Sequence, residues 1–331
     1  MPRMMKAIVI TRPGAVEVLE QQSRPVPEPG LGQVRVRVRA SALNRADIAQ
    51  RRGVYPAPPG APDDIPGLEY AGEIDAAGTD ARLWPVGSRV MGIAGGGAHA
   101  EYLCVHEREV IPVPDRLSWE EAAAIPEVFL TAWDGLFGQL RVQPGERILI
   151  HAVGSGVGTA ALQLARTAGA TVFGSSRSVA KIGKAKDFGL EVGVDSSSED
   201  WPAQIETAAG REGIHCILDL VGGSYLEGNL RVLAQRGRLL VVGLTAGSRA
   251  ELDLGSLLRK RITITGTVLR SRPMEEKMEL ARDFAERALP LFTSGRVSPV
   301  IDCVYSFDDI RAAHERMESN ATFGKIVLRW E

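Results

Sequence analysis

Residues 148–165, ILIHAVGSGVGTAALQLA, decide the fold of this chain. The first three residues are apolar and predict a buried strand, glycines follow at Gly154, Gly156 and Gly158, and an alanine- and leucine-rich helix begins near Thr159. A strand, a tight glycine turn and a helix N-terminus together form a site for a dinucleotide pyrophosphate, because the backbone can approach the phosphates there and the helix start offers unpaired N–H groups. The stretch therefore predicts nucleotide binding and redox chemistry.

The glycine pattern departs from the common fingerprint G-x-G-x-x-G, because Thr159 stands at the last glycine position. A tight turn that merely packs through small residues is the alternative interpretation. Residues 171–175, TVFGS, lie at the distance expected for the next strand of a βαβ unit, and they favour the dinucleotide site.

The length and composition bound the class of protein. A chain of 331 residues exceeds one average domain and predicts two. Its 44% hydrophobic and 24% charged residues, with a net charge of −2, indicate a soluble globular protein with no electrostatic reason to bind nucleic acid or an anionic membrane. No segment approaches the roughly 20 apolar residues of a membrane helix, and the N-terminal apolar stretch is too short for a signal peptide. We therefore expect a cytoplasmic protein with a small-molecule substrate.

The three cysteines, Cys104, Cys216 and Cys303, are dispersed and form no C-x-x-C motif. This spacing argues against a disulfide scaffold and excludes a thiolate-rich zinc site within one chain. We interpret all three as ordinary buried or half-buried thiols.

The chain divides into a β-rich first part and an alternating second part. Residues 33–39, QVRVRVR, alternate strictly and predict a strand with one face in the core, and the proline-rich residues 55–66 predict a surface loop near a site. Ser118 and Glu121 predict a capping box at a helix start. Beyond it we expect the following strands and helices: strands at 147–151, 171–174, 191–194, 215–220, 238–243 and 261–267, and helices at about 126–140, 157–168, 179–188, 201–209 and 224–234.

Six strands with helices between them predict an α/β fold with a doubly wound parallel sheet of the Rossmann type. A late helix at 274–291, a helix at 309–317 and a strand at 325–330 cannot easily extend that sheet, so we expect them to return to the first domain. The predicted domains are residues 1–123, 124–270 and 271–331, the last being the return. We expect the site in the cleft between the domains.

The end of the second predicted strand, GSSRSVAK at 174–181, indicates which nucleotide binds. Sites that prefer NAD usually carry a carboxylate there for the ribose 2′-hydroxyl, and this stretch has none. It offers Ser176, Arg177 and Lys181, which suit a 2′-phosphate, so we expect NADPH. The alternative is a solvated helix start with ordinary surface cations.

Several long blocks resemble one known family. They are SALNRADIAQRRGVYPAPPGA at 41–61, IPGLEYAGEI at 65–74, AAAIPEVFLTAW at 122–133, LIHAVGSGVGTAALQLA at 149–165, LDLVGGSY at 218–225 and FGKIVL at 323–328. On these blocks the chain resembles the zinc-free quinone oxidoreductases of the medium-chain dehydrogenase/reductase superfamily. The likeness is closest to the tumour-suppressor-inducible type, and zeta-crystallin is more distant.

The resemblance implies a GroES-like domain around a Rossmann domain, NADPH as cofactor, and hydride or stepwise electron transfer to quinones or related enones. The family's glycine turn reads A-x-x-G-x-x-G. Ala152 and Gly158 match it, whereas Ser155 stands at the middle glycine, as in the closest subgroup. Many relatives have a tyrosine near the 2′-phosphate where this chain has Ser196, which leaves Lys181 and the serines as phosphate ligands.

The resemblance also predicts that no metal is bound. Zinc alcohol dehydrogenases of the superfamily place a cysteine and a histidine where this chain has Asn44 and Leu68, and neither residue is a credible zinc ligand. The lobe with four cysteines is absent as well. None of the histidines sits at ligand spacing from another, and we interpret all five as surface or packing residues: His99, His106, His151, His215 and His314.

A quinone needs no Lewis acid, because its carbonyls are conjugated and its reduced ring is aromatic. The protein has to hold the acceptor near the nicotinamide and place donors where negative charge develops. The resemblance puts Asn44 and Tyr55 in this catalytic role, with water as an alternative proton source. On sequence alone, Asn44 could equally be a turn or cap asparagine and Tyr55 a loop aromatic over apolar surface. Asp47 is assigned to holding the loop.

The cofactor contacts follow from the glycine turn and from position in the resemblance. Thr131 corresponds to a residue beside the nicotinamide ribose, and Gly222 permits close backbone approach or simply makes a turn. The complete predicted set is Thr131, Gly154, Ser155, Gly156, Val157, Gly158, Ser176, Arg177, Lys181, Gly222, Gly243, Leu244, Leu269, Arg270, Ser271 and Lys325.

Residues 262–267, ITITGT, would form an edge strand whose β-branched residues favour pairing. Members of the family commonly pair this edge across a two-fold axis, so we expect a homodimer through residues 261–267.

Two other functions stay open. One is an NADPH-dependent enone, alkenal or enoyl-thioester reductase on the same scaffold. The other is a non-catalytic NADPH-binding protein with a structural or regulatory role. The sequence does not identify the physiological acceptor, the choice between one- and two-electron transfer, or the source of the proton.

Overall fold

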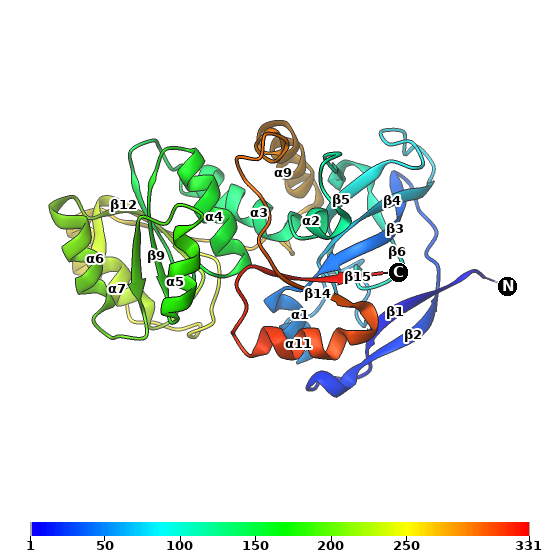
Figure 1. Cartoon of the computed structure of the whole chain (residues 1–331), viewed down its shortest axis with the longest axis horizontal. Coiled ribbons are helices and arrows are strands. Elements are labelled where there is room, and N and C mark those ends of the chain that lie inside the picture. Colours follow the sequence, from blue (N-terminus) through cyan, green and yellow to red (C-terminus); the bar gives the residue numbers. More distant parts are fainter. Residues whose placement is uncertain (1, 331) are drawn as a thin grey trace. The chain divides into compact units, whose positions relative to one another are not determined.

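The computed structural model describes residues 2–330. The chain forms two compact units, which we call unit 1 (Met1–Leu130 with Leu269–Glu331) and unit 2 (Thr131–Val268). The boundaries predicted after residues 123 and 270 fall a few residues from those of unit 2. Figure 1 shows the elements of each unit.

Unit 2 contains a six-stranded sheet in which every strand pairing is parallel. In spatial order the strands are β10 (Val192–Asp195), β9 (Thr171–Ser176), β8 (Arg147–Ile150), β11 (Ile214–Asp219), β12 (Leu233–Val241) and β13 (Thr263–Gly266). The chain order reverses between β8 and β11, which defines the switch point of a doubly wound sheet. The predicted Rossmann architecture is confirmed.

The helices of unit 2 cover both faces of this sheet, with α4 and α5 on one face and α6 and α7 on the other (Figure 1). Their bounds are α4 (Gly156–Thr167), α5 (Val179–Lys186), α6 (Trp201–Ala209), α7 (Tyr225–Val232) and α8 (Leu254–Lys260). Helix α3 (Pro126–Trp133) continues into a π-helical turn, Asp134–Gln139.

The helix predicted at 224–234 ends earlier than expected, because β12 already begins at Leu233. Lys260 explains the early end. Its ammonium donates to the backbone carbonyls of Leu230, Arg231 and Leu233 at 2.7–2.9 Å, and it thereby satisfies carbonyls that a helix end leaves without partners. Sequence periodicity did not reveal this long-range cap.

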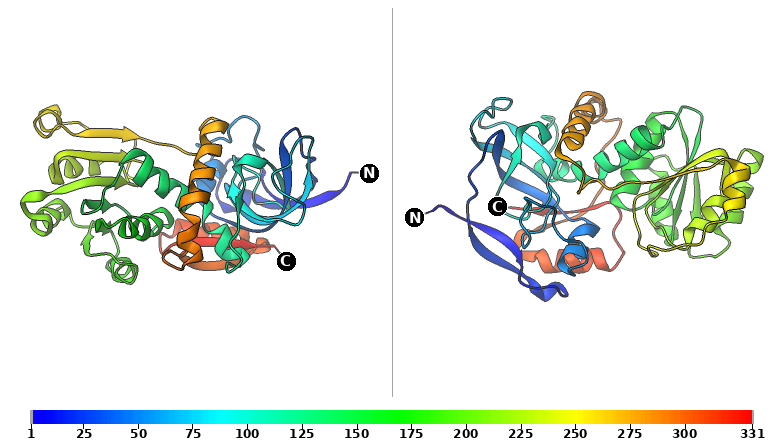
Figure 2. Two further views of the ribbon diagram at one scale, coloured as in Figure 1. Left: turned by 90° about the horizontal axis from the view of Figure 1, so that it is seen from above. Right: turned by 180° about the vertical axis from the view of Figure 1, so that it is seen from behind.

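Unit 1 contains a seven-stranded sheet and a separate two-stranded ribbon. The sheet has the order β14 (Ile301–Ser306), β15 (Lys325–Arg329), β3 (Gln33–Ala42), β4 (Glu69–Ala77), β5 (Arg89–Ile93) and β7 (Ile111–Pro112), and β6 (Tyr102–His106) also pairs with β3. Figure 2 shows the ribbon of β1 (Met4–Ile10) and β2 (Leu19–Pro25) in dark blue. The last strand, β15, lies antiparallel to β3, so the end of the chain is built into the sheet of its first part.

The helices of unit 1 are short except for α9, and they lie at the following residues: α1 (Arg45–Arg51), α2 (Trp119–Ala123), α9 (Met274–Arg287), α10 (Leu289–Thr293) and α11 (Ile310–Glu318). Single 3₁₀ turns lie at Val16–Val18, Glu107–Glu109 and Phe307–Asp309, with a fourth in unit 2 at Gly210–Glu212. The capping box predicted at the start of α2 is confirmed, because the Glu121 N–H donates to Ser118 Oγ at 3.1 Å and the Ser118 N–H donates to the Glu121 carboxylate at 2.9 Å.

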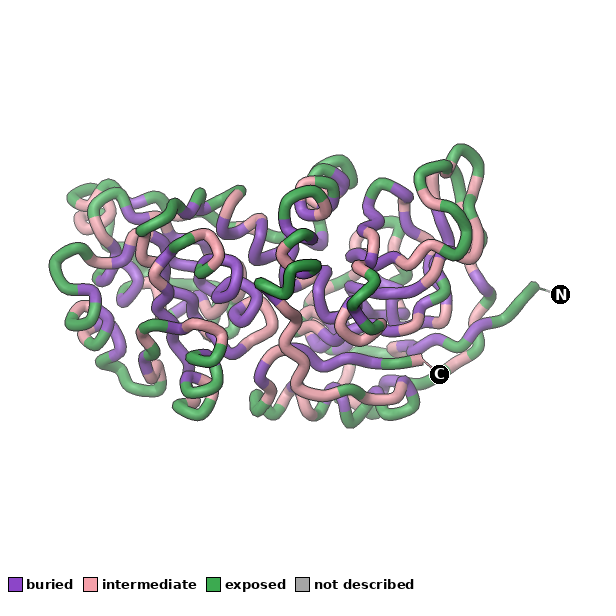
Figure 3. Tube along the Cα trace, turned by 45° about the horizontal axis from the view of Figure 1, so that its top comes forward, coloured by how far each residue is buried: buried purple, intermediate pink, exposed green. Residues whose placement is uncertain are grey.

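The alternation in β3 has the predicted effect on one face of the strand, where Val34, Val36 and Val38 are buried. The other face is not simply polar and exposed, because Arg35 is buried as well and donates to both oxygens of Asp75. Figure 3 shows the exposed residues mainly in the outer loops of the trace and the buried residues mainly inside it. Within residues 2–330, no helix combines the length and apolarity that crossing a bilayer requires.

Candidate functional site

The glycine turn of unit 2 connects β8 to α4 at the carboxyl edge of the sheet. The helix starts at Gly156, next to the start of the predicted range 157–168 and before Thr159, because Ser155 caps it: the Gly158 N–H donates to Ser155 Oγ at 3.0 Å. A Cβ on Gly158 would lie 2.5 Å from the carbonyl oxygen of Ala152, so only glycine fits there. The turn can therefore receive a pyrophosphate at the start of α4, where a helix has backbone N–H groups without partners inside the helix.

The proposed 2′-phosphate ligands lie where β9 runs into α5. Ser176 is buried, and its hydroxyl accepts the Ser178 N–H at 3.2 Å, while Ser178 caps α5. Arg177 is exposed and Lys181 is half-buried. The neighbouring strand β10 ends with Asp195 opposite Ser176, and hydrogen bonds from Ser197 hold the pKa of that carboxyl below its usual value. Two cations and one carboxylate thus surround this strand end.

A buried polar chain, which we call the His151 chain, crosses the ends of three adjacent strands. His151 Nδ1 lies 2.6 Å from Ser175 Oγ, and His151 Nε2 lies 2.6 Å from Asn229 Oδ1. Asn229 Nδ2 donates to Asp219 at 3.0 Å, which leaves its Oδ1 as the acceptor for His151. His151 therefore carries its proton on Nε2 and accepts the Ser175 hydroxyl on Nδ1, and burial lowers its pKa.

The far end of the His151 chain fixes a glycine turn. The second oxygen of Asp219 accepts the N–H groups of Val221 and Gly222 at 2.8 and 2.9 Å. Gly222 has a φ of +67°, and a Cβ there would lie 2.8 Å from the carbonyl oxygen of Gly243. The structure thus brings Gly222 and Gly243 together. The sequence interpretation of His151 as a packing residue missed this role, although its position directly after β8 was a usable signal.

The other predicted residues of unit 2 differ in how far they are exposed. Thr131 is 9% exposed at the start of the unit, and Leu244 is 56% exposed after β12. Gly154 is buried, while Gly156 and Val157 are half-buried in the first turn of α4.

In unit 1, Asn44 lies between the end of β3 and the start of α1. Its backbone N–H donates to Asp47 Oδ2 at 2.7 Å, so it does cap the helix, as the alternative interpretation supposed. Its amide does more than cap. Nδ2 donates to Glu69 Oε1 at 2.8 Å, and Oδ1 accepts from Lys325 Nζ at 2.7 Å. Two charged residues therefore fix the orientation of the Asn44 amide.

Lys325, predicted as a cofactor contact, is 4% exposed and lies inside this cluster. Its ammonium donates to the carbonyl of Leu43, to Asn44 Oδ1 and to Glu69 Oε1, each at 2.6–2.7 Å. All three donors are engaged within unit 1, so the residue acts here by positioning Asn44 and Glu69.

Arg270, also predicted as a cofactor contact, holds the proline-rich loop. Its guanidinium donates to the carbonyl of Gly95 at 2.8 Å and to Gln50 Oε1 at 2.6 Å, and it lies 5.0 Å from the centre of the Tyr55 ring. Tyr55 is half-buried, and burial raises the pKa of its hydroxyl. The neighbours of Arg270 are also in unit 1: Leu269 is buried and Ser271 exposed.

Glu127, which sequence reasoning missed, belongs to the same cluster. It lies in the first turn of α3, its N–H donates to Glu69 Oε2 at 2.8 Å, and the residue is half-buried. Burial and the nearby Glu69 raise the pKa of Glu127 to about 8. Burial also raises the pKa of Asp47 to about 6, against the two backbone N–H bonds that it accepts. The available signal was that Glu127 is the one charged residue in the block AAAIPEVFLTAW.

The residues of unit 1 do not fit a zinc ion. Leu68 is buried and has no donor atom, and the oxygen of Asn44 already accepts from a lysine ammonium. Across residues 2–330, no three His, Cys, Asp or Glu side chains are placed to hold a metal.

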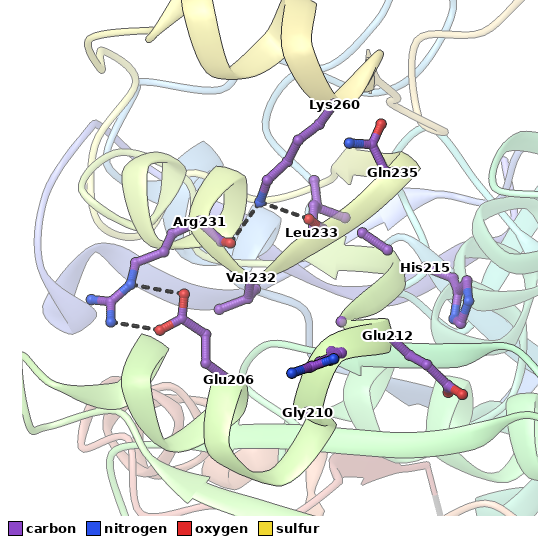
Figure 4. A pocket seen from close by; sticks show the side chains of 12 residues that line it. Glu206, Gly210, Glu212, His215, Arg231, Val232, Leu233, Gln235 and Lys260 are labelled. Atoms are coloured by element: carbon purple, nitrogen blue, oxygen red, sulfur yellow. Dashed lines mark hydrogen bonds and ion pairs between the residues drawn. The ribbon is translucent and has the colours of Figure 1, made fainter.

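A hollow in unit 2 is explained by structural ion pairs rather than by a ligand (Figure 4). It lies where β11 and β12 begin, whereas nucleotides bind at the opposite, carboxyl ends of such strands. Arg231 forms two hydrogen bonds with Glu206, and Lys260 is used by the carbonyls at the end of α7. We therefore do not assign the nucleotide to it.

The fold agrees with comparisons to known proteins. The family description "Alcohol dehydrogenase GroES-like domain" matches residues 30–115, and "Zinc-binding dehydrogenase" matches residues 156–287. The chain belongs to the medium-chain dehydrogenase/reductase superfamily, whose members are oxidoreductases that use a nicotinamide cofactor.

Particular relatives refine this assignment. The chain is 30% identical to a quinone oxidoreductase of Rattus norvegicus, over 98% of each protein, and 30% identical to the synaptic vesicle membrane protein VAT-1 homolog of Homo sapiens, over 98% of this chain and 86% of the relative. These relatives confirm the resemblance to quinone oxidoreductases.

Two solved structures are also similar. An NAD-dependent alcohol dehydrogenase has a TM-score of 0.88 and 32% identity over 99% of this chain and all of its own. CurK enoyl reductase has a TM-score of 0.86 and 26% identity over 98% of this chain and 99% of its own.

Proposed function

We propose that this protein reduces quinones with NADPH and without zinc. The observation that carries the proposal is the Asn44 amide, which a buried lysine and a buried glutamate hold in a fixed orientation at the position where zinc dehydrogenases bind their metal. Among residues 2–330, the second N–H of that amide reaches only the carbonyl of Ala42, at the long distance of 3.4 Å, so it is available to a stronger acceptor oxygen. An enzyme built this way requires an acceptor that is already electron-poor.

Different residues of the chain bind the acceptor and the parts of the nucleotide. The bound nicotinamide supplies the hydride. Asn44 donates a hydrogen bond to the acceptor oxygen on which charge develops, and Tyr55, backed by Arg270, holds the ring of the acceptor. The Ser155-capped turn and Gly158 bind the pyrophosphate, while Ser176, Arg177 and Lys181 bind the 2′-phosphate.

The experiment measures NADPH and NADH oxidation with 1,4-benzoquinone, 9,10-phenanthrenequinone and an alkenal. We expect turnover with NADPH and a quinone. In the variant Arg177→Ala/Lys181→Ala, KM for NADPH should rise about tenfold or more while KM for NADH stays unchanged, because only the 2′-phosphate loses its partners. Lys186→Ala, an exposed cation later in α5, is the matched control. A wild-type preference for NADH would overturn the nucleotide assignment.

An enoyl or alkenal reductase is the second candidate, favoured by the similarity to CurK enoyl reductase. Turnover of the alkenal with none of the quinones would establish it. NADPH binding without turnover of any acceptor would instead support a non-catalytic role.

A further inference from the structure

Five charged residues meet around Asn44, and their charges balance only if one carboxyl keeps its proton. Asp47, Glu69 and Glu127 supply three carboxyls, against the two cations Lys325 and Arg270. Buried charges without compensation are costly, so the group favours one neutral acid.

Hydrogen bonds decide which carboxyl is neutral. Asp47 accepts the N–H groups of Asn44 and Gly67 at 2.7 and 3.0 Å, and Glu69 accepts from Lys325, from the Asn44 amide and from the Glu127 N–H. Such bonds stabilise the ionised form. Within residues 2–330, no hydrogen bond or ion pair engages the Glu127 carboxyl, so Glu127 is the acid that stays protonated.

Glu127 also lies on the accessible side of the cluster. Asp47, Glu69, Lys325 and Arg270 are buried, whereas Glu127, Asn44 and Tyr55 are only half-buried. The Glu69 carboxylate links Asn44 and Glu127, because it accepts from the Asn44 amide with one oxygen and from the Glu127 N–H with the other. Tyr55 is close enough to Glu127 that a charge on the Glu127 carboxyl raises the pKa of the Tyr55 hydroxyl.

We propose that Glu127 is the proton donor of the reaction. The inference rests on the proposed quinone reduction, in which a hydride converts the quinone to a hydroquinone monoanion. The O–H bond of Glu127 breaks as the new O–H bond forms on the anionic oxygen that Asn44 holds. The Glu127 carboxylate then takes a proton from water after the hydroquinone leaves, so that one hydride and one proton are consumed in each turnover.

The test compares the pH dependence of kcat in the wild type and in Glu127→Gln, which retains the backbone bond to Glu69. In the wild type, kcat should fall above about pH 8, as the acid loses its proton. Glu127→Gln should lower kcat by about 100-fold or more and abolish this decline, while KM for NADPH stays unchanged. Glu127→Asp should restore part of the rate, and the exposed Glu276→Gln should behave as the wild type.

A second readout needs no turnover. In the protein without nucleotide, the infrared carbonyl band of a protonated carboxyl should be present at pH 6.5, disappear as the pH passes through about 8, and be absent from Glu127→Gln. The assignment of Glu127 as proton donor would be overturned if the wild type reduces quinones and Glu127→Gln keeps the full kcat with the same decline at high pH. This holds even if the variant has lost the infrared band. A wild type that reduces no quinone overturns the proposed function instead, and the band still reports the state of Glu127.

Discussion

Removing the ammonium of Lys325 should destabilise unit 1 strongly. In Lys325→Met, Glu69 stays buried, at 0% exposure, and loses the only cation that residues 2–330 place at hydrogen-bond distance from it. Breaking a buried ion pair by deleting one partner costs about 3–5 kcal/mol. For a unit of this size each kcal/mol lowers Tm by about 2–4 °C, so we expect a decrease of about 6–20 °C.

The size of this decrease should depend on pH. Burial already raises the pKa of Glu69 above its unfolded value, and the loss of Lys325 raises it further. A carboxyl whose folded pKa is raised destabilises the fold when it must ionise, so the cost is largest at high pH and shrinks as the pH falls toward the unfolded pKa. Differential scanning calorimetry should therefore show a larger loss at pH 8.5 than at pH 5.5.

Two variants make the reasoning testable. Glu69→Gln/Lys325→Met removes the stranded charge and should recover much of the lost Tm, whereas the exposed Lys186→Met should leave Tm unchanged. A loss below about 1 kcal/mol in the single variant, a loss independent of pH, or a double variant as unstable as the single one would refute the argument.

Two further predictions concern unit 2. His151→Leu should lower the stability of unit 2 by about 2–6 kcal/mol, because Ser175 and Asn229 each lose a buried hydrogen-bond partner at a cost of about 1–3 kcal/mol. Thermal unfolding measures this loss. An unchanged Tm would contradict the role given to the His151 chain. Size-exclusion chromatography with light scattering should show that the wild type is a homodimer. The variant Thr265→Lys changes an exposed residue of the edge strand β13 and should be a monomer, because like charges would meet across the two-fold axis. A wild-type monomer at micromolar concentration would exclude this interface.

The sheet of unit 2 could be predicted well because each of its strands is marked by a short run of consecutive residues. Continuous apolar runs such as 148–150 read as buried parallel strands, and all six strands lie within a few residues of the expected positions. The turn between β8 and α4 was harder to place. The sequence pattern put the helix start between Val157 and Thr159, but the hydroxyl of Ser155 caps it at Gly156.

The polar clusters could not be predicted because their members are distant in sequence. Lys325 and Asn44 are 281 residues apart, and no periodicity links them. Glu127 was not among the predicted residues, and its raised pKa depends on groups that lie on several separate segments. The same applies to Arg270, whose resemblance to a cofactor contact gave no sign of its bonds to Gly95 and Gln50.

The insertion of β15 beside β3 also orders events during synthesis. Unit 2 is one continuous segment, Thr131–Val268, so it can fold while later residues are still being translated. The sheet of unit 1 must wait, because Lys325 meets Leu43 across 282 residues of chain. On the ribosome, unit 2 can therefore fold first, and the hydrogen bonds around Asn44 form only when β15 has emerged from the exit tunnel.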